Sequence, residues 1–188
     1  MDTKTILTRG IEVVTFLFAG FGSFLLGIAP PGETDSQFAV GASSMLALFV
    51  LLFIPAVTKD QPLGRMKKVW LSVSLAFFVL AIIASIVYKG NLDKLTFAYP
   101  PGEKRAEHIA GTIMTPDAER FLKDNPSKAI AEIVAAFEGP AYLERVWTAE
   151  SIRRSKLILT ANYVVVVLAT AIMLFGLTEG ILVVPKST

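Results

Sequence analysis

The chain contains no cysteine and one histidine, His108. The lack of cysteine excludes disulfide bonds, cysteine-ligated zinc or iron–sulfur sites and thiol nucleophiles. One histidine leaves little material for a histidine metal site or a catalytic triad. The motifs GxxxxGK[ST], HExxH and GxSxG do not occur either. We therefore expect no metal, no cofactor and no enzymatic activity, and a membrane-embedded enzyme is the least favoured alternative.

Charged residues are also scarce. Only 18% of the 188 residues are charged, whereas 53% are hydrophobic, and a typical soluble domain has about 25% charged residues. The formal net charge is +2, and the lysines and arginines are scattered among acids. This pattern gives no sign of nucleic-acid binding, which would need basic residues clustered on one face. The deficit of charge indicates a protein that lies in lipid.

Four hydrophobic runs are long enough to cross a bilayer, which takes about 20 residues of helix. They cover about 11–29, 38–57, 69–88 and 157–177. The first is interpreted as a retained helix rather than a signal peptide, because its apolar stretch continues to Ile28. We predict an all-α integral membrane protein with transmembrane helices 1–3 in residues 1–88. A small helical extramembrane domain in 89–156 and a fourth transmembrane helix with a short tail in 157–188 complete the prediction.

Small residues recur on the predicted membrane helices. Ala19, Ser23 and Gly27 are spaced four apart and form one ridge of the first helix. Small residues let helices approach closely in lipid, where apolar burial gives little drive for association. The ridge serves either packing within one four-helix bundle or self-association of the chain, and the sequence leaves both open.

The basic residues of the short loops indicate the orientation. The loop after the first run has no Lys or Arg, whereas the loop after the second contains Lys59, Arg65, Lys67 and Lys68. Basic loops favour the cytoplasm, so we expect cytoplasmic termini and an extracytoplasmic 89–156, against a counter-signal from basic residues at both ends of that domain. The compact size and the lack of cysteine and of glycosylation sites favour a bacterial inner membrane.

Local signals predict helices within the domain. Thr115 and Pro116 are typical of a helix start, and this helix should reach about Lys123. A second helix with one apolar face is expected from about residue 129 to 137, ending at Gly139-Pro140. Thr148 should cap a last helix that continues into the fourth transmembrane segment, so that a displacement of the domain would reach the bilayer helix directly.

Two groups of polar residues are candidates for function. Within the fourth hydrophobic stretch these are Glu179, Asn162 and Thr160. Glu179 is a candidate to line a cation path or carry a proton, or else is an interfacial residue beyond a span that ends at Gly176. Asn162 and Thr160 are interpreted as packing contacts or as functional polar groups. The domain candidates for binding an anion, a lipid headgroup or a partner are Arg105, His108, Arg145, Trp147, Arg153 and Arg154.

Each domain candidate has a plainer interpretation. His108 beside Glu107 is either an acid–base couple or part of a solvated surface. The run from Arg153 to Lys156 either binds anionic lipid heads, if this end of the helix is cytoplasmic, or is a helix end that needs no ligand. Expected partners are membrane lipids and copies of the chain or other membrane subunits. We therefore expect a non-enzymatic oligomeric membrane protein whose domain senses a ligand or partner and acts on the helices, for example by opening a pore. The alternative is an accessory subunit of a larger membrane complex.

Overall fold

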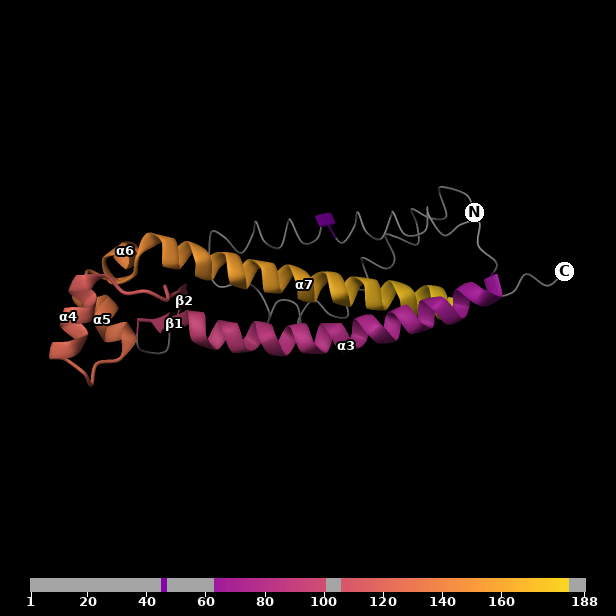
Figure 1. The fold of residues 1–188 in the computed structure, drawn as a ribbon, viewed down its shortest axis with the longest axis horizontal. Helices are drawn as coiled ribbons and strands as arrows, with labels where there is room; N and C mark the ends of the chain where they lie inside the picture. Colours follow the sequence, from indigo (N-terminus) through magenta and orange to yellow (C-terminus); the bar gives the residue numbers. More distant parts are fainter. Residues whose placement is uncertain (1–44, 47–62, 101–105, 183–188) are drawn as a thin grey trace. The chain divides into compact units, whose positions relative to one another are not determined.

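The computed structural model describes residues 45–46, 63–100 and 106–182 (Figure 1). The predicted span at 11–29 lies outside these residues, and so do Ala19, Ser23, Gly27 and Arg105. Of the predicted span at 38–57, only residues 45–46 are described. The described part is mostly helical and contains two helices that are long and apolar enough to cross a membrane. The elements are α3 (Leu63–Leu95), β1 (Thr96–Tyr99), β2 (Ala106–Ile109), α4 (Pro116–Asp124), α5 (Ile130–Ala136), the 3-10 helix η1 (Pro140–Tyr142), α6 (Leu143–Val146) and α7 (Ala149–Leu182).

The described residues divide into two compact units. One contains α3 up to Ile86 and α7 from Tyr163. The other, residues 87–162, contains the ends of these two helices and every shorter element.

Helix α3 is 33 residues long and extends past the predicted span of 69–88. It continues through Gly90 to Leu95, beyond the predicted end of the span at Tyr88. Its large apolar side chains are mostly exposed: the exposed fraction is 65% for Leu75, 49% for Val79 and 68% for Ile86. A core helix of a soluble protein would bury such residues. This pattern is compatible with a helix that faces lipid.

Helix α7 is one uninterrupted helix of 34 residues. It begins at Ala149, which confirms the predicted start after Thr148 and the predicted continuation into the last hydrophobic stretch. Residues Ala149–Leu177 form a candidate membrane span by length and composition. The helix then continues to Leu182.

Strands β1 and β2 form an antiparallel two-stranded sheet, so the prediction of a purely helical domain was wrong in this segment. The register pairs Thr96 with Ile109 and Tyr99 with Ala106. Thr, Phe and Tyr favour strands, and the prolines at 100 and 101 cannot continue a central strand or a helix. Each strand has only four residues, too few for a clear alternating pattern in the sequence.

The two predicted helices of the domain are present. Thr115 caps α4 as expected, since its Oγ1 accepts a hydrogen bond from the Ala118 backbone N–H at 3.3 Å. Helix α5 buries Ile133 and Val134 and ends before Gly139, whose φ of 88° favours glycine. Their apolar faces meet the sheet and α6 in one core, which comprises Phe97, Ala110, Ala118, Ile133, Val134, Val146 and Trp147.

Candidate functional site

The ends of α3 and α7 are fixed to the segment that follows β2. The Ala110 N–H donates to the Leu95 carbonyl at the end of α3, at 2.8 Å. One residue further on, Gly111 lies close to Trp147 and to Ser151 of α7. An added Cβ would be 2.5 Å from the Trp147 Cβ and closer still to the Ser151 Oγ. We call Leu95, Ala110, Gly111, Ile113 and Ser151 the junction.

Helix α7 is bonded to the junction through its first turn. The Thr148 N–H donates to the Ile113 carbonyl at 2.9 Å. The Ser151 hydroxyl donates toward the carbonyl oxygens of Ile113 at 3.2 Å and Thr148 at 2.9 Å. Ser151 is 2% exposed, and a buried hydroxyl that keeps its partners helps to specify one packing arrangement. The start of α7 is therefore tied to the domain by backbone and side-chain hydrogen bonds.

His108 lies in an aromatic group on the sheet. Its ring is 5.8 Å from that of Phe97, its cross-strand partner, and 6.4 Å from that of Tyr99. Phe97 in turn packs on Trp147 at 5.4 Å. Because successive strand residues point to opposite faces of a sheet, Glu107 and His108 are directed apart. This geometry does not favour the acid–base couple considered from the sequence.

Arg145 already has partners within the domain. Its Nη1 lies 2.7 Å from the Glu138 Oε1, and its guanidinium lies 4.8 Å from the centre of the Tyr142 ring. Both charged side chains are more than half exposed, so the ion pair contributes at most about 1 kcal/mol. Glu138 holds a φ of 70°, a region that non-glycine residues seldom occupy. Binding of an external anion by Arg145 stays a prediction.

The other domain candidates are found in different places. Trp147 is 2% exposed and belongs to the core, while Arg153 and Arg154 are exposed on the second turn of α7. The structure joins His108 and Trp147 through Phe97 but gives Arg145 a separate set of partners. A ligand role for these residues stays a prediction.

The polar candidates of the last hydrophobic stretch all belong to α7. Thr160 and Asn162 are partly exposed. Glu179 lies in the helix, which does not end at Gly176, but its side chain is outside the described part of the structure. In the buried stripe of the same helix, Ser155 is 0% exposed and its Oγ has no hydrogen-bond partner among the described residues.

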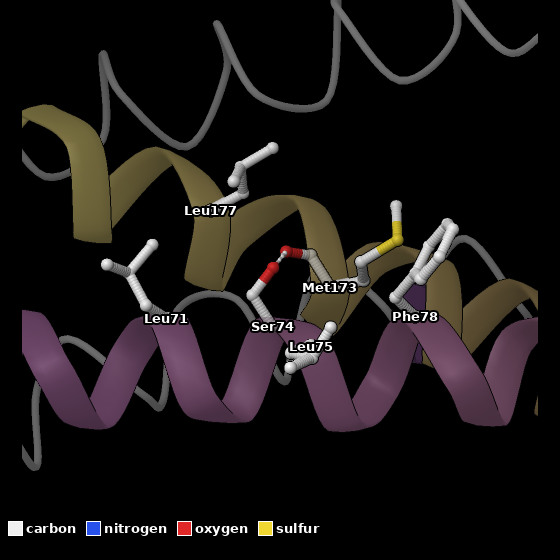
Figure 2. Close-up of a pocket in the computed structure, with 6 residues that line it drawn as sticks. All are labelled: Leu71, Ser74, Leu75, Phe78, Met173 and Leu177. Carbon is white, nitrogen blue, oxygen red and sulfur yellow. Dashed lines mark hydrogen bonds between the residues drawn. The ribbon is translucent and has the colours of Figure 1, made fainter.

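Helices α3 and α7 pack closely within the first compact unit. The Ser74 hydroxyl donates to the Met173 carbonyl at 2.8 Å (Figure 2). A Cβ added at Gly176 would lie 3.1 Å from the Trp70 carbonyl oxygen, and the Trp70 and Phe175 rings meet edge to face at 5.4 Å. Small residues thus allow the close approach that helices in lipid need.

Beside this contact is an apolar groove of about 300 Å³. Its lining side chains, drawn in Figure 2, are Leu71, Ser74, Leu75, Phe78, Met173 and Leu177. The glycines of this contact were not predicted from the sequence. Gly176 and Gly180 are spaced four apart, a GxxxG pattern that would have identified the packing face.

Among residues 63–100 and 106–182, no group of three or more His, Asp or Glu side chains is arranged to hold a metal ion. The arrangement offers packing surfaces and exposed charges, with hydrogen bonds that join the domain to α7. Comparison with protein-family models, with curated proteins and with solved structures finds no match to this chain.

Proposed function

We propose that the chain is a non-enzymatic, oligomeric, multi-pass membrane protein in which the domain senses a ligand or partner and acts on the membrane helices through α7. The observation that carries this proposal is the continuity of α7. Its first turn is hydrogen-bonded to the domain at Ile113, and its later turns form an apolar stretch of membrane length. A helix keeps its backbone hydrogen bonds along its whole length, so strain at the junction is carried into the apolar part.

The membrane location is supported by the exposed apolar surface of α3. Leu75, Phe78 and Val79 are about half exposed or more, and monomeric soluble proteins seldom expose contiguous apolar surface of that extent. The full proposal has four spans, with 11–29 and 38–57 as the other two. The bacterial inner membrane, cytoplasmic termini and an extracytoplasmic domain belong to the same proposal.

The effector step is assigned to the far end of α7. Glu179 is an ionisable residue near the end of an apolar helix, and such residues often mark ion or proton pathways. In this proposal a homo-oligomer brings several copies of α7 together, and Glu179 lines a cation path. If the domain only docks a larger complex, the chain is instead an accessory subunit.

Cysteine labelling tests the membrane arrangement, because the chain has no cysteine of its own. Lys123→Cys places a thiol on exposed α4, and Val79→Cys places one on the exposed apolar face of α3. In intact bacterial cells we expect a membrane-impermeant maleimide to label Lys123→Cys. Val79→Cys should react only after the membrane is dissolved in detergent. Labelling of Val79→Cys in intact membranes would contradict the proposal.

Ion flux from liposomes tests the effector step. The full chain should release a trapped cation, and Glu179→Gln should reduce that release by at least tenfold, because the carboxylate charge is lost. Glu132→Gln, an equal charge change on exposed α5, is the matched control and should have no effect. Liposomes that stay tight with a monomeric native chain would favour the accessory subunit.

A further inference from the structure

The exposed side chains change from apolar to basic on both long helices near the junction. On α3, Val87 is 48% exposed and is followed by exposed Lys89. On α7, exposed Lys156 is followed by Leu157, which is 69% exposed. All four residues belong to the compact unit of residues 87–162.

The two changes lie at similar distances from the junction. Leu95 and Ser151 are linked through Ala110 and Gly111, so they mark a common level on the two helices. At the helical rise of 1.5 Å per residue, Lys89 is about 9 Å from Leu95 and Lys156 is about 7.5 Å from Ser151. Two helices from opposite ends of the domain sequence therefore reach apolar exposure at matching heights, as they should if a flat lipid surface begins there.

The segment between the junction and this level is strongly basic. It contains one acid, Asp93, and a second, Glu150, lies just before Ser151 and 3.9 Å from Arg153. Both side chains of that ion pair are about 80% exposed, so water screens it and leaves the arginine available to other anions. Five exposed basic residues, which we call the collar, surround these acids: Lys89, Lys94, Arg153, Arg154 and Lys156.

We propose that the collar binds the phosphate groups of anionic phospholipids at the membrane surface. Guanidinium groups bind phosphate oxygens in a bidentate manner, and basic residues next to a membrane helix attract anionic headgroups. Leu157, next to Lys156, would lie among the acyl chains of the same lipids. This inference rests on the proposed membrane location and names phosphatidylglycerol-type lipids as the partners of the site.

Lipid titration of the purified full chain tests the proposal. Native mass spectrometry in detergent would follow binding of phosphatidylglycerol and of phosphatidylcholine. We expect tighter binding of phosphatidylglycerol, and a loss of affinity of about fivefold for each collar residue that is neutralised. The triple variant Arg153→Gln, Arg154→Gln and Lys156→Gln should thus lose about 100-fold in affinity for phosphatidylglycerol, with phosphatidylcholine binding unchanged.

The matched control removes the same charge elsewhere on the domain. Arg120→Gln, Lys123→Gln and Lys128→Gln alter exposed residues on and after α4, and this variant should bind phosphatidylglycerol as the native chain does. Arg153→Lys with Arg154→Lys keeps the charge and should retain most of the binding. Thermal unfolding of each variant separates lost lipid binding from lost folding.

Three results would overturn the proposal. The first is equal binding of both lipids by the native chain, and the second is unchanged phosphatidylglycerol binding by a folded collar variant. The third is displacement of the lipid by millimolar inorganic phosphate, which would make the site one for soluble anions. A chain that stays dispersed without detergent would instead contradict the proposed membrane location, so the two failures are distinguishable.

Discussion

Gly111 has no room for a side chain. A Cβ there would meet the Ser151 Oγ and would lie 2.5 Å from the Trp147 Cβ and 2.8 Å from its Cγ. A Cβ added at Gly90, in α3, would have open space around it, with no neighbouring atom within 4 Å. The two glycines therefore have opposite requirements, although both belong to the unit of residues 87–162.

Alanine substitutions at these glycines should change stability in opposite directions. Gly111→Ala should destabilise the domain by about 1–3 kcal/mol, because Trp147 and Ser151 must move. Gly90→Ala should raise stability by up to about 1 kcal/mol, because alanine favours a helix interior. Thermal unfolding in detergent, followed by circular dichroism, gives both changes. Equal unfolding temperatures for the two variants would contradict the packing at Gly111.

Residues whose contacts lie a few positions away in the sequence were predictable. Residues whose contacts lie far along the chain were not. Thr115 was identified as a cap because its partner, Ala118, lies three residues away. Gly111 was not identified, since the atoms that exclude its side chain come from Trp147 and Ser151. His108 was noticed as a lone histidine, but its aromatic partners depend on a strand register that four-residue strands do not reveal.

Helices, too, were predictable only where the deciding residues are local in the sequence. The starts of α4 and α7 follow from residues at their first turns, and both were predicted correctly. The span on α3 was predicted to end at Tyr88, which Lys89 and Gly90 follow. The helix instead continues to Leu95, whose carbonyl accepts a hydrogen bond from the Ala110 N–H. The spacing of Gly176 and Gly180 indicates the packing face that α3 and α7 share, and this face was not predicted.

The close contact between helices α3 and α7 depends on Gly176. Gly176→Leu should destabilise the native chain by about 2 kcal/mol, because the side chain would be forced against the Trp70 carbonyl and Ser74. Ala161→Leu, on an exposed position of the same helix, is the control and should change stability by less than about 0.5 kcal/mol. The measurement is the unfolding temperature in detergent. A larger loss from Ala161→Leu than from Gly176→Leu would contradict this packing.

For the whole molecule, the exposed apolar surface sets the conditions under which the chain is soluble. Val79, Ile83 and Ile86 of α3 are each about half exposed or more, and removing such surface from water contributes about 25 cal/mol per Å². Composition alone indicated lipid, because the charged fraction is only 18%. The number of spans depends on residues outside the described part. The oligomer depends on contacts between copies of the chain.

We expect the purified full chain to stay dispersed only in detergent or lipid. Removal of detergent should pellet it, because the apolar face of α3 would then associate non-specifically. In detergent, light scattering coupled to gel filtration should give the mass of a closed homo-oligomer. A dispersed monomer in plain buffer would contradict both the membrane location and the oligomer.

Ser155 has a consequence for how this protein can vary among organisms. Its hydroxyl is fully buried without a hydrogen-bond partner among the described residues, whereas Ser151, one turn earlier, bonds to Ile113 and Thr148. Replacing an unpaired buried hydroxyl by hydrogen removes a desolvation cost, whereas removing a paired one loses a bond. Natural variants should therefore carry alanine freely at position 155 and keep serine at position 151.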